Sequence, residues 1–293
     1  MVTGQYAGRV AIERVGVIGS GIMGSGIAEV AAASGCEVIV RSRSQATADG
    51  MVAVLEKSLA RQVEREKRTA EDAAAILARV RGTGELEELE GCDLVIESVV
   101  EDLSVKKALF GELDRLVKRE AILATNTSTL PVVEMAMETS RPEQVCGIHF
   151  FNPATAMRLV EVVIPITAAD ATIAAVHQFV EACGKEAVEV QDRAGFVVNA
   201  LLFPYLNSAI KLHEAQVASL EGIDRAMMGG CGFPMGPFAL LDLVGLDTSL
   251  AILEALYLES ADPSVSPATT LRRMVAAGRL GRKSGHGFYD YRH

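Results

Sequence analysis

A glycine-rich segment near the start of the chain, Gly19-x-Gly21-x-x-Gly24, limits the possible folds more than any other feature. Apolar residues 15–18 precede it and small or apolar residues follow it, which is the pattern of a strand, a tight turn and a helix start. In that setting Gly19 makes the turn, Gly21 lets a pyrophosphate approach the backbone, and Gly24 lets the helix pack on the strand. The segment therefore predicts a dinucleotide site at the unpaired N–H groups of the helix. A turn without a ligand is the alternative, and a second strand at 37–41 argues against it.

Composition and charge narrow the class of protein. The chain has 293 residues, of which 49% are hydrophobic and 23% charged, as expected for one large globular domain or two ordinary ones. Its formal net charge is −10 and it has no long basic run, so we expect no nucleic acid partner. The apolar runs are too short to span a bilayer, so we expect no membrane partner.

The cysteines and residues 1–13 indicate the cellular compartment of the protein. The five cysteines are odd in number and include no C-x-x-C pair, so we expect buried thiols in a reducing compartment, without a disulfide framework or a metal site. Residues 1–13 lack the basic region and the apolar stretch of a signal peptide. These features predict a cytoplasmic protein.

Strand-like and helix-like segments alternate up to about residue 192. The alternation predicts an α/β fold, a Rossmann-type doubly wound sheet with its ligands at the carboxyl ends of the strands. A helical stretch from residue 46 to about 80 is too long for an ordinary crossover, so we expect it to divide near Thr69 into a helical-hairpin arm. The expected strands are 15–18, 37–41, 93–99, 121–125, 145–150, 159–164 and 187–190, and the other expected helices are 22–34, 105–117, a short one from Pro131, and 168–183.

The pattern changes after residue 192, where no alternating strand pattern remains. Helices are expected at 196–214, at 219–229 with Ser219 as its cap, and at 237–243, 248–259 and 267–277. We place a domain boundary near residues 193–195, between a dinucleotide-binding domain over 1–193 and an all-α C-terminal domain over 194–293.

Polar side chains gather where three of the expected strands end. Asn126 and Ser128 follow one strand, and His149 and Asn152 lie at the end of the next. Glu161 lies on the strand after that, so it could meet His149. A histidine oriented by a carboxylate is a good general base near neutral pH. Because a lone histidine is as often structural, it is the polar residues around His149 that favour catalysis.

Several motifs occur in one order: G-S-G-I-M-G, T-N-T-S, H-F-F-N-P, L-V-E-V, G-F-V-V-N, M-G-P and G-R-K-S-G-x-G-F-Y. With them the chain resembles the 3-hydroxyacyl-CoA dehydrogenase family, most closely its bacterial 3-hydroxybutyryl-CoA members, over nearly its whole length from Arg14. The resemblance implies interconversion of an L-3-hydroxyacyl-CoA and a 3-ketoacyl-CoA by hydride transfer to or from a nicotinamide cofactor, NAD and/or NADP. It also implies a homodimer formed largely by the helical domain.

The resemblance assigns roles to particular residues. His149 would take the proton of the 3-hydroxyl, Glu161 would orient and stabilise the imidazolium, and Ser128 would bond the substrate oxygen. Asn199 would position the reacting group from the second domain. The implied catalytic residues are thus His149, Glu161, Ser128 and Asn199; the implied cofactor contacts are Gly19, Gly21, Ile22, Met23, Gly24, Ser42, Arg43, Glu101, Lys106, Asn126, Asn152 and Lys283; and the implied substrate contacts are Ser128, Asn199 and, toward CoA, Ser58 and Arg65.

One position departs from the family pattern. The second strand of a dinucleotide-binding unit ends in an acidic residue that binds the adenosine ribose 2′-hydroxyl. Ser42 stands at that position here, and Arg43 follows it. A 2′-phosphate would meet no carboxylate at Ser42 and could pair with Arg43, so the sequence leaves the choice between NAD and NADP open.

Two other functions share features with this sequence. A 3-hydroxyacid dehydrogenase of the 6-phosphogluconate type also begins with G-x-G-x-M-G, but it uses a lysine base four residues before an asparagine, and Gly195 stands four residues before Asn199. A non-catalytic, crystallin-like relative would bind nucleotide without turnover. The set of Ser128, His149, Glu161 and Asn199 argues against it, because a binding module needs no base.

Overall fold

The computed structural model describes residues 12–292, and the chain divides into two compact units between Asp192 and Arg193. The expectation that residues 1–13 form no signal peptide concerns a stretch of which 1–11 lie outside the described residues. Among residues 12–292, every helix is too short or too polar to cross a membrane.

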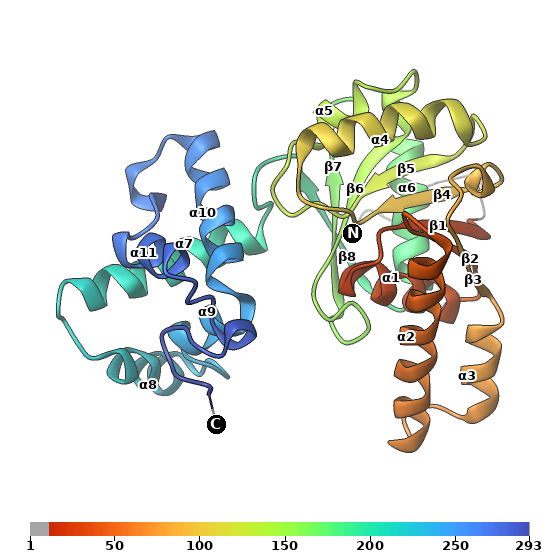
Figure 1. The fold of residues 1–293 in the computed structure, drawn as a ribbon. Coiled ribbons are helices and arrows are strands. Elements are labelled where there is room, and N and C mark those ends of the chain that lie inside the picture. The colour runs from red at the N-terminus through yellow and green to blue at the C-terminus, as the bar shows by residue number, and fades with distance from the viewer. Residues whose placement is uncertain (1–11, 293) are drawn as a thin grey trace, which may run out of the picture. The chain divides into compact units, whose positions relative to one another are not determined.

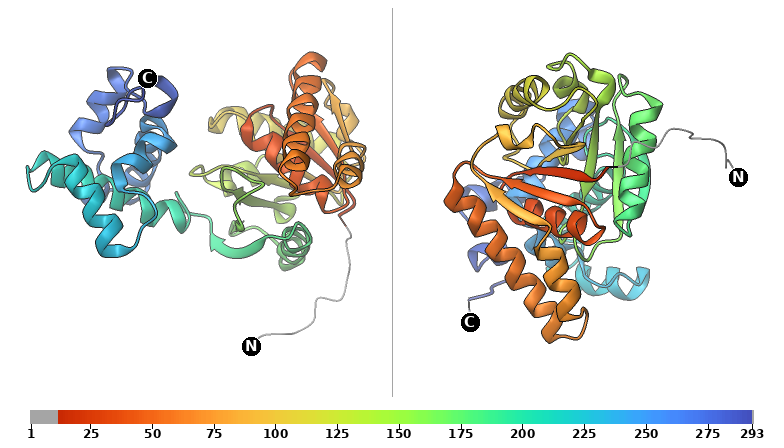
Figure 2. Two further views of the ribbon diagram at one scale, coloured as in Figure 1. Left: turned by 90° about the horizontal axis from the view of Figure 1, so that it is seen from below. Right: turned by 90° about the vertical axis from the view of Figure 1, so that its right-hand side faces the viewer.

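An eight-stranded sheet forms the centre of the first unit, with the strand order β3-β2-β1-β4-β5-β6-β7-β8 (Figure 1). Neighbouring strands are parallel except β6 and β7, so β7 and β8 run opposite to the others. The central strands are buried runs rich in valine and isoleucine, because helices cover both faces of the sheet (Figure 2). The strands are β1 (Arg14–Ile18), β2 (Glu37–Arg41), β3 (Val80–Thr83), β4 (Leu94–Glu97), β5 (Ile122–Thr125), β6 (Val145–Phe150), β7 (Leu159–Ile164) and β8 (Glu186–Gln191).

The predicted Rossmann-type architecture is confirmed for this unit. One apolar core of this unit joins residues of β1, β2 and β4 to the helices packed on them. Because β1, β4, β5 and β6 are parallel, their carboxyl ends share one edge of the sheet, where ligands of such folds bind. The helices outside the arm are α1 (Ile22–Ala33), α4 (Leu103–Leu116), α5 (Val132–Ala136) and α6 (Asp170–Ala182), with short 3₁₀ turns η1 (Glu87–Leu89) and η2 (Pro142–Gln144).

The helical-hairpin arm is also confirmed. Helices α2 (Gln45–Glu64) and α3 (Ala70–Leu77) lie side by side and extend away from the sheet in both figures. Ser44 and Thr47 form a capping box at the start of α2, and the Thr69 hydroxyl accepts the Asp72 N–H at the start of α3. The division therefore falls where the sequence predicted it.

The end of the arm corrects one prediction. The helical stretch does not run on to Val80, because β3 (Val80–Thr83) follows α3 and forms the edge of the sheet. The strand has four residues and includes Gly82, so it shows no alternating pattern. A Cβ at Gly82 would lie 3.0 Å from the Ala48 backbone, so this glycine lets α2 pack closely on the edge strand.

Helices form the second unit within its described residues, apart from isolated β-bridges of His286 to Gly281 and Asp290. Its own apolar core is made by residues of all five α-helices. The Ser219 hydroxyl accepts the Gly222 N–H, which confirms the predicted cap. The elements are α7 (Val198–Glu214), α8 (Leu220–Cys231), α9 (Pro237–Val244), α10 (Leu246–Ser260), α11 (Thr269–Ala276) and the 3₁₀ turns η3 (Pro263–Val265) and η4 (Arg282–Ser284).

Candidate active site

The glycine turn between β1 and α1 has the shape that a pyrophosphate requires. Gly19 has φ +122°, and a Cβ there would lie 2.3 Å from the Ser98 carbonyl oxygen. A Cβ at Gly24 would lie 2.1 Å from the Gly19 carbonyl oxygen, so α1 packs directly on the turn. Gly21, by contrast, has open space on its Cβ side, and no side chain caps the helix it begins. The backbone at the positive end of α1 is therefore accessible to an anionic group.

A cavity of about 720 Å³ lies beside this turn. The turn residues Gly19 to Gly21 line it together with Arg41, Ser42 and Arg43 at the end of β2, and residues of α4 complete its wall. Ile22, which follows the turn, leaves 78% of its surface exposed. The cavity thus extends from the glycine turn to the strand end where a dinucleotide fold places the adenosine ribose.

A buried histidine–carboxylate pair lies at the same edge of the sheet. His149 on β6 and Glu161 on β7 are directly opposite in the antiparallel register, so their side chains share one face. The Nδ1 of His149 lies 2.7 Å from Glu161 Oε2, and its Nε2 lies 3.1 Å from the Ser128 hydroxyl. His149 is 4% exposed and Glu161 1% exposed. The arrangement holds the imidazole by one nitrogen and directs the other toward Ser128.

The residues around this pair fix its position. The side-chain oxygen of Asn126 accepts the Phe150 N–H at 2.8 Å, which ties the end of β5 to the end of β6. The Phe151 ring lies 4.6 Å from the His149 ring, and Asn152 beyond it is exposed. Burial raises the pKa of the Cys146 thiol on β6 to about 12, so this thiol is neutral and no nucleophile near neutral pH.

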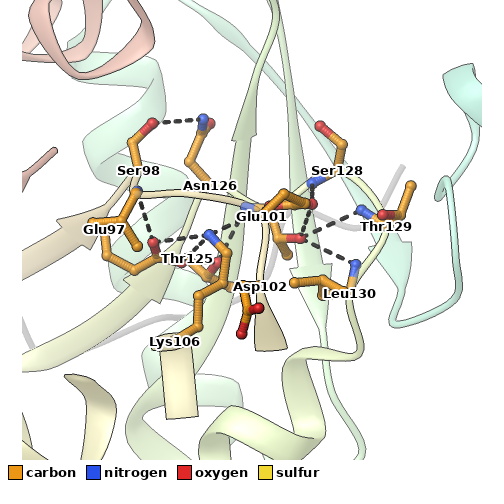
Figure 3. Close-up of polar contacts among 12 residues, drawn as sticks. Glu97, Ser98, Glu101, Asp102, Lys106, Thr125, Asn126, Ser128, Thr129 and Leu130 are labelled. Atoms are coloured by element: carbon orange, nitrogen blue, oxygen red, sulfur yellow. Dashed lines mark hydrogen bonds and ion pairs between the residues drawn. The ribbon is translucent and has the colours of Figure 1, made fainter. Parts of the chain in front are cut away.

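A second polar network supports the Ser128 loop (Figure 3). Lys106 on α4 places its ammonium 2.8 and 2.9 Å from the two oxygens of Glu97, and 3.4 Å from Glu101. Glu101 in turn accepts the Thr127 hydroxyl at 2.5 Å and the Ser128 N–H at 3.0 Å. Glu97 and Lys106 are almost completely buried. The buried ion pair therefore anchors Glu101, and Glu101 holds the backbone of the serine loop.

Comparison with known proteins identifies the family. The family model described as the NAD binding domain of 3-hydroxyacyl-CoA dehydrogenase matches residues 14–193, and the model described as its C-terminal domain matches residues 195–291. The chain belongs to the 3-hydroxyacyl-CoA dehydrogenase family.

Individual members of the 3-hydroxyacyl-CoA dehydrogenase family match over almost the whole chain. The 3-hydroxybutyryl-CoA dehydrogenase of Mycobacterium tuberculosis is 46% identical over 96% of this chain and 99% of that protein. The enzyme of the same name from Clostridioides difficile is 44% identical over 95% of this chain and 99% of that protein. The crystal structure of (S)-3-hydroxybutyryl-CoA dehydrogenase from Ralstonia eutropha matches with a TM-score of 0.94 and 41% identity, over 97% of this chain and all of that chain.

Of the residues that the family resemblance assigns, two lie on the arm, Ser58 and Arg65, and two lie in the second unit, Asn199 and Lys283. On the arm, the Ser58 hydroxyl donates to buried Glu29 at 2.8 Å, and Arg65 is exposed at the end of α2. In the second unit, Asn199 is 8% exposed on α7, and Lys283 forms an ion pair with Asp247.

Sequence reasoning missed two supporting residues. The sequence pattern indicates Glu97 only as part of an apolar strand and Thr127 only as part of a loop motif. The signal for Glu97 was present, because a carboxylate inside the run D-L-V-I-E-S-V must find a cation or hydrogen-bond donors when that strand is buried. Lys106 meets that need, but the family resemblance assigns it to the cofactor alone.

Proposed function

We propose that the protein is an NAD(P)-dependent dehydrogenase that interconverts an L-3-hydroxyacyl-CoA, 3-hydroxybutyryl-CoA in particular, and the corresponding 3-ketoacyl-CoA. The observation that carries this proposal is the buried contact of His149 with Glu161 on one side and Ser128 on the other, at the strand edge that bears the glycine turn. The names of the relatives support the same substrate.

The chemistry divides between the cofactor and the protein. A bound nicotinamide supplies a hydride acceptor for the hydrogen on C3 of the hydroxyacyl group. His149 Nε2 takes the proton of the 3-hydroxyl, and Glu161 stabilises the imidazolium that results. Ser128 donates a hydrogen bond to the substrate oxygen, which becomes the 3-keto oxygen. In the reverse direction His149 returns the proton to that oxygen.

The other assignments remain part of the proposal. The first helical turn, at Gly21, Ile22 and Met23, receives the pyrophosphate, and Glu101 and Asn126 support the nicotinamide half of the site. Asn152 and Lys283 complete the cofactor contacts, whereas Lys106, buried and paired with Glu97, supports the cofactor site through Glu101. Ser58 and Arg65 bind CoA from the arm, and Asn199 contributes from the helical domain.

The His149→Ala variant tests the proposal. Reduction of acetoacetyl-CoA is followed by the loss of NADH absorbance, and loss of a general base should lower kcat by about 10²- to 10⁴-fold. NADH binding, followed by fluorescence, should persist. His177→Ala is the matched control, because His177 also pairs with a glutamate, 3.4 Å away, but lies on α6. Near-normal kcat in the His149 variant would refute the assignment.

The two rival functions make different predictions in the same assay. A dehydrogenase of the 6-phosphogluconate type would need a lysine base where Gly195 stands, and it would not turn over acetoacetyl-CoA. A crystallin-like relative would bind NADH and turn over no substrate at all. The identity to named 3-hydroxybutyryl-CoA dehydrogenases favours neither alternative.

We further propose that the protein forms a homodimer through its helical domain and works in the cytoplasm. Several apolar side chains of the second unit are exposed, among them Leu201 at 72% and Leu258 at 86%. The expectation of buried thiols holds for Cys36, Cys92 and Cys146, whereas Cys183 is partly exposed and Cys231 is exposed.

A further inference from the structure

The end of β2 has a charge pattern unlike that of an NAD-specific site. Where such sites place a carboxylate against the ribose 2′-hydroxyl, this chain places Ser42. Ser42 is 5% exposed, lines the 720 Å³ cavity, and is fixed by its N–H to the Thr83 carbonyl at 3.1 Å. A small neutral side chain therefore stands at the position that reads the ribose.

Two arginines flank this serine. The Nε of Arg41 is buried and has no hydrogen-bond partner within residues 12–292, and Arg41 lines the same cavity. A buried donor without an acceptor is unfavourable, so a shift of the Arg41 guanidinium that brings this N–H to a bound anion would be favourable. Arg43 is exposed and also lines the cavity. Glu112 on α4 is the acidic residue of the same wall, and it offsets part of the positive charge.

We propose that Arg41, Ser42 and Arg43 form a subsite for the 2′-phosphate of NADP(H). A phosphate monoester carries about −1.5 to −2 charges near pH 7 and accepts hydrogen bonds from arginine in a planar fork. Ser42 offers a hydroxyl to the same group. This inference rests on the dinucleotide site of the proposed function and assigns the residues of that site that would hold the 2′-phosphate.

The subsite permits NADP(H) without excluding NAD(H). An exposed arginine such as Arg43 is screened by salt and strengthens phosphate binding only about fivefold. Ser42 can still bond a ribose hydroxyl, and Glu112 opposes the phosphate. We therefore expect kcat/KM for the two coenzymes to differ by less than about a hundredfold, because none of these groups supplies a larger discrimination.

Binding measurements test the subsite without reference to turnover. Dissociation constants for NADPH and NADH are measured by fluorescence, and those for 2′,5′-ADP and 5′-AMP by calorimetry. We expect 2′,5′-ADP to bind more tightly than 5′-AMP, and this difference to shrink as salt rises. A thousandfold or greater preference for NADH over NADPH would overturn the proposal.

Variants at the three positions sharpen the test. Arg43→Ala should weaken NADPH about fivefold, and Arg41→Ala about tenfold or more because its buried donor is lost, each with little effect on NADH. Ser42→Asp should weaken NADPH binding at least tenfold. Ser42→Asn introduces a side chain of the same size as aspartate but without its charge, and should not weaken NADPH binding by that much. Arg119→Ala, an exposed arginine before β5, is the control for a general loss of positive charge. Equal effects of these variants on NADPH and NADH would refute the subsite.

The outcome is separable from that of the proposed function. If both coenzymes bind but neither supports reduction of acetoacetyl-CoA, the dehydrogenase assignment fails and the subsite stands. If NADH supports reduction and the arginine variants leave NADPH binding unchanged, the subsite fails and the dehydrogenase stands.

Discussion

At the scale of single residues, the Ser128 hydroxyl lies beside the proposed general base. Its Oγ lies 3.1 Å from His149 Nε2, while its backbone N–H is held by Glu101. Removal of the hydroxyl therefore changes one hydrogen bond and leaves the loop in place.

Ser128→Ala should lower kcat/KM for acetoacetyl-CoA by a factor that corresponds to about 2–4 kcal/mol of transition-state stabilisation, because a bond to the reacting oxygen strengthens as charge develops there. Steady-state kinetics measure the loss, and Thr129→Ser, a neighbouring hydroxyl residue on the same loop, is the control. An unchanged kcat/KM would leave Ser128 as a turn residue only.

The buried pair of Glu97 and Lys106 makes a prediction about stability. Glu97→Gln leaves the Lys106 ammonium buried without its main partner, so the free energy of unfolding should fall by about 3–5 kcal/mol. The double variant Glu97→Gln/Lys106→Met removes both charges and should recover much of that loss. Denaturant unfolding measures both variants.

Lys107→Met is the control for that pair, since Lys107 lies next in sequence and its carboxylate partners are more exposed. It should cost far less than Glu97→Gln, because solvent screens exposed pairs. A loss for Glu97→Gln no greater than that of the control would show that the buried pair contributes little.

Much of the candidate site can be predicted from the sequence, but the contacts between side chains of different elements cannot. His149 and Glu161 follow from strand spacing, because residues at the joined ends of adjacent strands face each other. The unpaired Nε of Arg41 and the Glu97 network depend on which side chains meet across different elements. A pattern along one segment does not carry that information.

At the scale of elements, the sequence indicated those with a strong apolar period or a capping residue. Thr69 and Ser219 mark helix starts by side-chain chemistry that is local in sequence. β3 was missed because its pairing with β2, not its own composition, makes it a strand.

A buried aspartate joins α9 to the C-terminal segment and makes the next prediction. Asp242 is 1% exposed and accepts the N–H groups of Phe288 and Tyr289 at 2.9 and 2.8 Å, and the Tyr291 hydroxyl at 3.2 Å. Asp242→Ala leaves these donors without an acceptor, and should cost about 3 kcal/mol of stability.

Thermal denaturation measures that loss. Asp247→Ala is the control, because Asp247 pairs with Lys283 at a partly exposed position and should cost less than about 1 kcal/mol. If the two variants melt at the same temperature, the C-terminal segment is not held by Asp242.

At the scale of the whole molecule, the exposed apolar residues of the helical unit make the last prediction. Leu201 on α7 and Leu258 on α10 leave most of their surface in contact with water, which is unfavourable unless a partner covers them. We expect sedimentation to give twice the mass of the single chain at micromolar concentration.

The double variant Leu201→Lys/Leu258→Lys should shift the mass toward that of one chain, because a dimer would bury these charges. Val54→Lys, at a residue 56% exposed on the arm, should leave the mass unchanged. A wild-type monomer at that concentration would contradict the proposed dimer, and unaltered association of the double variant would exclude these helices from the interface.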